Sequence, residues 1–113
     1  MISRSLELSL NRAVHEAQKR RHIYVTVEHI LFALLDNKEA KKSLLACGAN
    51  LKEIRLDLEG YFEEKIEKSI QNGPFNPHPT LAFQRVLQVA AQQVVSSGKE
   101  QISGENILIA IFS

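Results

Sequence analysis

The sequence predicts an all-α fold, a pseudo-duplicated helical bundle in which one helical unit is followed by a partial second copy. The stretch 26–36 places its apolar residues at the spacing of a helix face that packs on a core. It returns at 103–112, offset by 77 residues. Identical residues are Glu28 and Glu105, Ile30 and Ile107, Leu31 and Leu108, and Ala33 and Ala110. The same offset lays 6–17 on 83–94 without gaps, so two helices and their connection are duplicated.

A proline-rich segment separates the two copies. All three prolines of the chain lie between 71 and 79, where we expect neither helix nor strand. The sequence therefore predicts one domain over 1–113, made of repeat one (1–70), a linker (71–79) and a partial repeat two (80–113).

The composition is that of an ordinary soluble globular domain. The chain has 113 residues, of which 44% are hydrophobic and 24% charged. Fourteen basic residues against thirteen acidic ones give +1, which favours neither a nucleic-acid nor a membrane partner. Apolar runs fall far short of the ~20 residues that span a bilayer, and the N-terminus lacks a signal-peptide pattern. A single cysteine, Cys47, indicates a reducing compartment, so we expect a cytoplasmic protein.

The first helix is expected from about Ser5 to Arg20. The basic run 19–22 closes it, and positive charge suits a helix C-terminus, although a docking patch is an alternative explanation. The tripeptide 23–25 is β-rich, but no second strand is evident, which predicts a buried extended connector.

Capping residues mark the next helix starts. Thr26 caps the central helix, and Glu28 places negative charge in its first turn. Asp36 and Glu39 resemble a capping box that opens a short third helix. Its inward residues are expected to be Ala40, Leu44 and Leu45, with Cys47 buried and Gly48 as the left-handed C-terminal cap.

The remaining helices follow the same logic. Asn50 and Glu53 open a long fourth helix, and Thr80 caps a fifth that Gly98 stops. The inner face of the fourth helix is expected to hold Leu51, Ile54, Leu58, Tyr61, Phe62, Ile66 and Ile70, and Leu81 is expected to pack in the fifth.

The last helix, from Ser103, is still strongly apolar when the sequence ends. The first unit has four helices and the second has two, so Ile107, Leu108 and Ile111 are expected to lack cover. Either the second unit is truncated or another chain completes it.

The sequence holds no recognisable catalytic motif. It has no phosphate-binding loop and no G-x-S-x-G, and the segment that starts at His15 lacks the second histidine of H-E-x-x-H. His15, His22 and His29 are seven residues apart, but His22 is expected outside the helices of the other two, not on their face. A zinc site of His22 with Glu63 is a minor alternative, and with it a metal enzyme.

Three segments carry a resemblance to a known family. They are LELSLN at 6–11, TVEHIL at 26–31 and PTLAFQRVLQ at 79–88. The whole chain resembles the N-terminal domain of the Clp/Hsp100 AAA+ unfoldases, most closely the ClpA type, the ATPase partner of the ClpP protease. The resemblance implies two four-helix repeats, of which the second stops here after two helices.

The resemblance also implies a function and a surface. Such a domain receives substrates above the ATPase ring and docks the adaptor ClpS, while ATP and Mg²⁺ act in separate ATPase modules, so no cofactor is expected here. The family's docking surface corresponds to His22, Glu28, Thr80 and Arg85, whereas position 23, commonly acidic in ClpA, is Ile23. Thr80 and Glu28 also have purely structural explanations, as a cap and a first-turn carboxylate. The alternative function is a free-standing helical protein-interaction module.

Overall fold

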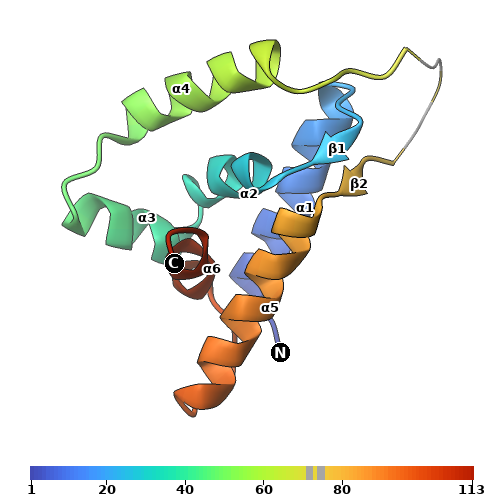
Figure 1. Cartoon of the computed structure of the whole chain (residues 1–113). Helices are drawn as coiled ribbons and strands as arrows, with labels where there is room; N and C mark the ends of the chain where they lie inside the picture. The colour runs from blue at the N-terminus through green and yellow to red at the C-terminus, as the bar shows by residue number, and fades with distance from the viewer. Residues whose placement is uncertain (71–72, 74–75) are drawn as a thin grey trace.

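The computed structural model describes residues 1–70, 73 and 76–113, and within them it is mostly helical. The helices are α1 (Arg4–Lys19), α2 (Val27–Leu34), α3 (Lys38–Ala46), α4 (Leu51–Glu64), α5 (Leu81–Ser96) and α6 (Gly104–Ile111). Two short strands, β1 (Tyr24–Val25) and β2 (His78–Pro79), complete the elements (Figure 1). The predicted all-α class is confirmed.

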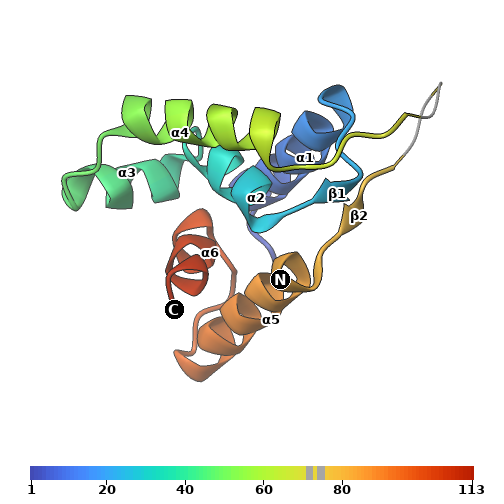
Figure 2. The ribbon, with the colours of Figure 1, turned by 45° about the horizontal axis from the view of Figure 1, so that its top comes forward.

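Helix α2 lies at the centre of the molecule. It contacts α1, α4, α5 and α6, and α4 lies on the opposite side of it from α5 and α6 in both ribbon views (Figures 1 and 2). Its inward residues Ile30 and Leu34 are fully buried and belong to the core cluster that joins all the helices. The apolar stripe that the sequence predicted for 26–36 is therefore the middle of the core.

Short polar side chains cap the helices, as their types require. Ser3, Asn50, Thr80 and Ser103 each accept a hydrogen bond from a backbone N–H in the first turn of the following helix. One prediction is wrong: α3 is capped by Asn37, not Asp36, since Asn37 Oδ1 accepts from the N–H of Ala40. Asp36 instead forms ion pairs with Arg55 and Arg12.

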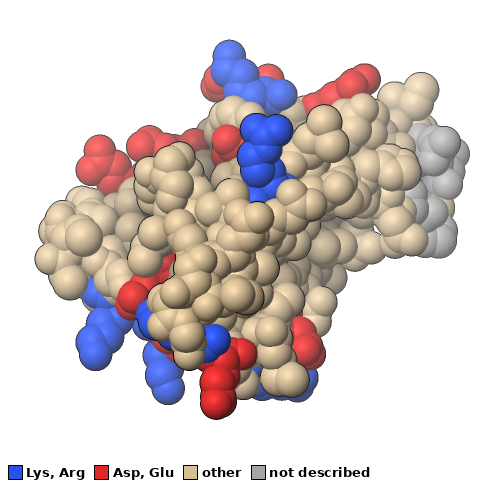
Figure 3. Space-filling model, turned by 60° about the horizontal axis from the view of Figure 1, so that its bottom comes forward, with Lys and Arg blue, Asp and Glu red and all other residues tan. Residues whose placement is uncertain are grey.

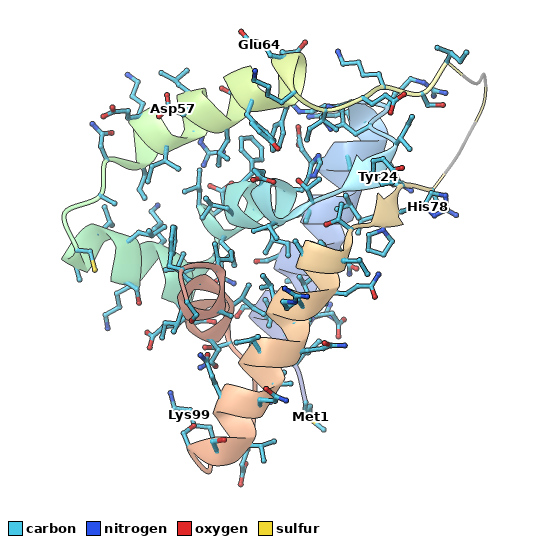
Figure 4. The ribbon with its side chains drawn as sticks, in the orientation of Figure 1. Met1, Tyr24, Asp57, Glu64, His78 and Lys99 are labelled. Carbon is cyan, nitrogen blue, oxygen red and sulfur yellow. The ribbon has the colours of Figure 1, made fainter. Side chains whose placement is uncertain are left out.

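The expectation that no strand involves 23–25 or the proline-rich segment is wrong. Tyr24 and Val25 pair in parallel with His78 and Pro79, and Figure 4 shows Tyr24 and His78 on these neighbouring segments. Tyr24 is exposed rather than buried. Proline is tolerated there because the pair is only two residues long and has open edges. Of the predicted linker, residues 71–72 and 74–75 lie outside the described part of the chain.

A second parallel bridge matches the first under the 77-residue offset. Ile2 pairs with Ile102, as Pro79 pairs with Val25. The N–H of Ser3 donates to the Ile102 carbonyl at 2.9 Å, and that of Thr80 donates to the Val25 carbonyl at 3.1 Å. The internal duplication thus extends to the hydrogen bonds that fix the helix starts.

Helix α3 covers α6, which corrects the expectation of an uncovered last helix. Ile107 is fully buried, Leu108 is 7% exposed and Ile111 is half-buried, because α3 and α5 both pack on α6. Ile109 of α6 is exposed, and so is Phe112, the first residue after the helix.

Some expected core positions are exposed. Helix α4 ends at Glu64, so Ile70 lies beyond it and is 98% exposed. Exposure also contradicts the inward assignments of Leu45, Cys47 and Leu81. Gly48 does adopt the predicted left-handed conformation, with φ of 80°. No helix in the described residues is long and apolar enough to cross a bilayer.

Candidate functional site

The start of α5 is tied to the start of α2 through the strand pair. Thr80 Oγ1 accepts from the N–H of Phe83 at 3.1 Å, and the Thr80 N–H donates to the carbonyl of Val25, the residue before the α2 cap Thr26. The first turns of α2 and α5, which carry Glu28 and Arg85, are therefore held in a fixed relation by backbone bonds.

A groove of about 350 Å³ lies between these helix starts and the end of α6. Its lining is apolar except for one guanidinium and the terminal serine: Val27, Leu81, Ala82, Arg85, Val86, Val89, Ala110, Ile111 and Ser113. Leu81 is 79% exposed at its edge. Residues 81, 82, 85 and 89 share one face of α5 because they are spaced three and four apart. An apolar groove with a single cation suits an apolar segment that carries a carboxylate.

The candidate residues that face solvent have no charged partner among the residues that the structure describes. In the described residues, Arg85 makes no ion pair and no side-chain hydrogen bond, and neither does Glu28. Arg85 is exposed and Glu28 half-buried. The Glu28 carboxylate acts electrostatically on Tyr61 of α4, whose pKa is raised by burial first and by this carboxylate second. Both charges are therefore available to a partner, on the two helices that the strand pair ties together.

The remaining candidate, His22, is placed differently. Its side chain is fully buried, as is that of His29, and His22 Nδ1 lies 2.8 Å from His29 Nε2. The Thr26 N–H donates to His29 Nδ1 at 2.9 Å, so His29 carries its hydrogen on Nε2 and donates to His22 Nδ1. His22 Nε2 then donates to the carbonyl of Phe62 at 3.1 Å. This histidine relay has one consistent direction, in which both rings are neutral.

The relay lies in an aromatic and cationic environment. The His29 ring stacks on Phe62, with centroids 4.7 Å apart, and the Arg20 guanidinium carbon is 5.0 Å from the centroid of Phe62. Burial, then the adjacent His22, lowers the pKa of His29 to about 4, and burial likewise lowers the pKa of His22. Both rings are therefore neutral at pH 7.

His22 lies outside α1 and α2, as the sequence predicts, but its contact with His29 was not predicted. Arg21, with φ of 59°, reverses the chain after α1 and brings His22 against α2, while His15 stays exposed on α1. The 77-residue offset could have predicted the capping role of His29. It aligns His29 with Asn106, whose Oδ1 accepts the Ser103 N–H at 2.8 Å. No sequence signal identified Phe62 as its stacking partner.

The geometry does not favour the zinc alternative. Both ring nitrogens of His22 are engaged in hydrogen bonds, and Glu63 forms ion pairs with Arg20 and Lys68. Within the described ranges, no group of three or more His, Cys, Asp or Glu side chains could hold a metal ion.

Comparison with known proteins assigns the chain to a family. The model of the Clp repeat (R) N-terminal domain matches residues 1–113. A ClpA homolog protein of Fuscovulum blasticum is 36% identical over 98% of this chain, and the chaperone protein ClpB of Chlamydia pneumoniae is 30% identical over 93%. The Hsp104 N-terminal domain of Candida albicans superposes with a TM-score of 0.84 at 17% identity, covering 99% of this chain and 73% of that one.

These matches define an all-helical domain of the kind that Clp/Hsp100 ATPases carry at the N-terminus. The chain belongs to the family of Clp repeat N-terminal domains. It spans 14% of the length of the ClpA homolog and 12% of that of ClpB.

Proposed function

We propose that this chain is the partner-receiving N-terminal domain of a ClpA-like, ATP-dependent unfoldase, and that it binds a ClpS-type adaptor and protein substrates destined for the ClpP protease. The 36% identity to a ClpA homolog supports the ClpA type. ATP and Mg²⁺ would act in modules outside this chain, so the domain alone is expected not to turn over nucleotide.

The observation that carries the proposal is the unpaired Arg85 in an apolar groove beside the capped start of α5. Since this guanidinium has no partner in the described part of the chain, it is available for a bidentate contact to a carboxylate of the adaptor. Glu28 would contribute the opposite charge from α2, and Thr80 would set the start of α5. His22 has no exposed side chain, so its contribution to docking would be indirect.

The surrounding surface fits protein docking. Figure 3 shows the face obtained when the lower edge of Figure 1, with α5 and α6, is turned forward: its middle is mostly uncharged, and charged side chains lie mainly toward the edges. An apolar centre with a polar rim is the usual anatomy of a protein interface. Ile23, where ClpA commonly has an acidic residue, is half-buried, and its N–H donates to the Glu67 carbonyl. The adaptor contact would therefore rest on Glu28 and Arg85 rather than on position 23.

Titration of the domain with a ClpS-type adaptor tests the proposal. Arg85→Ala and Glu28→Ala are each expected to weaken binding by about tenfold or more, since a lost charge-assisted contact is worth roughly 1.5–3 kcal/mol. Lys99→Ala, which removes a cation in the loop after α5, is the matched control and should bind like the parent. A folded parent that fails to bind would remove the adaptor role.

A second candidate, the self-associating interaction module, rests on a different surface. A groove of about 570 Å³ between α3 and α6 has apolar walls that include Leu44, Leu108, Ile109 and Phe112. Light scattering separates the two functions: a dimer that Phe112→Ser disrupts would support self-association, whereas a monomer at all concentrations would exclude it.

A further inference from the structure

We propose that His22 and His29 are positioning residues that hold the partner surface in its binding geometry and release it when acid protonates them. The proposal concerns regulation of the surface assigned above and rests on that proposed function. It depends on the geometry of the relay, on its connection to Thr80, and on the charges around it.

The relay joins elements that are far apart in the chain. At one end, His22 Nε2 donates to the Phe62 carbonyl, which lies in the last turn of α4 and has no helical partner of its own. At the other end, His29 Nδ1 accepts the N–H of Thr26, the cap of α2. The carbonyl of the preceding residue, Val25, accepts a hydrogen bond from the N–H of Thr80. A single series of hydrogen bonds and one peptide unit therefore connects the end of α4 to the start of α5.

Protonation cannot occur without breaking this series. Each ring uses one nitrogen as an acceptor that faces a donor: the Thr26 N–H for His29, and the His29 N–H for His22. A proton on either acceptor would set two N–H groups against each other. At His29 Nδ1 the new N–H would find Thr26 Oγ1, 3.1 Å away, as an acceptor, but the Thr26 N–H would lose its own, and an unpaired donor is costly beside two fully buried rings. The break falls at the α2 cap or at the contact between the rings.

The neighbouring cations and carboxylates act on the two rings in opposite directions. Arg20 approaches from α1 and Lys68 from the segment after α4, and both oppose a positive ring. The nearby carboxylates, Glu16 of α1 and Glu63 of α4, already form ion pairs with Arg20, and Glu63 also pairs with Lys68. Burial is the main cause that keeps the pKa of both rings low. The adjacent His22 adds to it for His29, and Arg20 and Lys68 add to it for His22, while Glu16 and Glu63 act in the opposite direction.

The second repeat provides a matched comparison within the same molecule. Asn106 stands where the offset places His29 and accepts the Ser103 N–H just as His29 accepts that of Thr26. An amide oxygen does the capping there without a titratable group. His29→Asn is therefore the substitution that keeps the cap of α2 and removes its sensitivity to protons.

The experiment measures adaptor affinity between pH 7.5 and 4.0 for the parent, His29→Asn and the exposed control His15→Asn. The parent and the control are expected to lose roughly twofold in affinity or more over this range, because a ring whose pKa is about 4 is half protonated at pH 4. His29→Asn should lose markedly less, despite a lower melting temperature at pH 7.5, since it gives up the stacking on Phe62. A parent profile that is flat, or a variant that falls as steeply as the parent, would overturn the proposal.

Two measurements on the parent alone keep the test independent of the adaptor and of the variant's folding. NMR titration of the ring protons should give both histidines a pKa below 6.5. Exchange of the Thr26 and Thr80 amide protons should accelerate, beyond the intrinsic pH effect, as the rings titrate. Rings that titrate near 6.5, or amides whose protection ignores the titration, would contradict it. If no adaptor binds even at pH 7.5, the proposed function fails, while these two readouts still decide whether the relay opens.

Discussion

Asn37 and Gly104 show how a single atom constrains the packing of two helices. The buried Asn37 side chain caps α3 through Oδ1, and its Nδ2 donates to Ser9 Oγ of α1 at 3.0 Å. Gly104, the first residue of α6, lies directly against this amide, and a Cβ there would clash with Asn37 Oδ1. The offset places Val27 at the equivalent position of α2, so the glycine is specific to the second copy.

We expect Gly104→Ala to destabilise the domain by about 1–3 kcal/mol, because the new methyl group would displace the Asn37 amide from its hydrogen bonds. Urea denaturation of the parent and the variant measures the loss. Asn37→Ala should also destabilise the domain, and the double variant should cost less than the sum of the two, since the clash needs both side chains. Strict additivity would contradict this account.

At the scale of the element, the ends of α1 and α5 share one conformation reached by different residues. The N–H of His22 donates to the Ala17 carbonyl, and at the offset the N–H of Lys99 donates to the Val94 carbonyl. This reach across the last turn needs one left-handed residue, Arg21 after α1 and Gly98 after α5, with φ of 59° and 73°. Gly98 has the conformation at little steric cost, whereas Arg21 adopts it in a position fixed by pairing with 67–69.

Two glycine substitutions with the same added methyl group should act in opposite directions. Gly98→Ala is expected to destabilise the domain by about 1 kcal/mol, because alanine resists a positive φ. Gly60→Ala, in the exposed middle of α4 with open space around its Cβ, should stabilise it by roughly 0.5–1 kcal/mol. Thermal melts of both variants give the comparison, and shifts of the same sign would refute the conformational explanation.

At the scale of the whole molecule, local sequence signals predicted the helices but not the long-range contacts between them. Apolar spacing and cap residues such as Thr80 and Ser103 act within one turn of helix, so they can be recognised along the sequence. The cover that α3 gives to α6 joins residues 62 positions apart, as in the hydrogen bond from Ser43 to Glu105. Periodicity shows that a face is buried but not which element buries it.

The candidate site also contains residues that the sequence could predict and residues that it could not. Motif resemblance could point to Glu28, Thr80 and Arg85, because these residues stand in or beside the first turns of two recognisable helices. The burial of His22 and its contact with His29 depend on the left-handed turn at Arg21 and on the end of α4 at Glu64. Both are set by tertiary packing. The exposed candidate residues could therefore be predicted from the sequence, whereas the buried contact between His22 and His29 is visible only in the structure.

The same buried pair predicts how the stability of the whole domain depends on pH. In the folded state the pKa of His29 is about 4 and that of His22 is lowered, whereas both would lie near 6.5 when unfolded. The unfolded chain thus binds more protons below pH 6.5, so this contribution to stability is fully present above that pH and is lost as pH falls toward 4.

The loss of stability should be roughly 1–3 kcal/mol. It should appear as a falling urea midpoint between pH 7 and 4.5 with an unchanged slope, which His15→Asn leaves intact and His29→Asn reduces. Below pH 4.5, Glu16 adds to the decline: although burial opposes it, hydrogen bonding and charge from Arg20 hold its pKa under the ordinary value. A midpoint that stays constant from pH 7 to 5 would show that the histidines accept protons inside the fold, against the closed geometry of the relay.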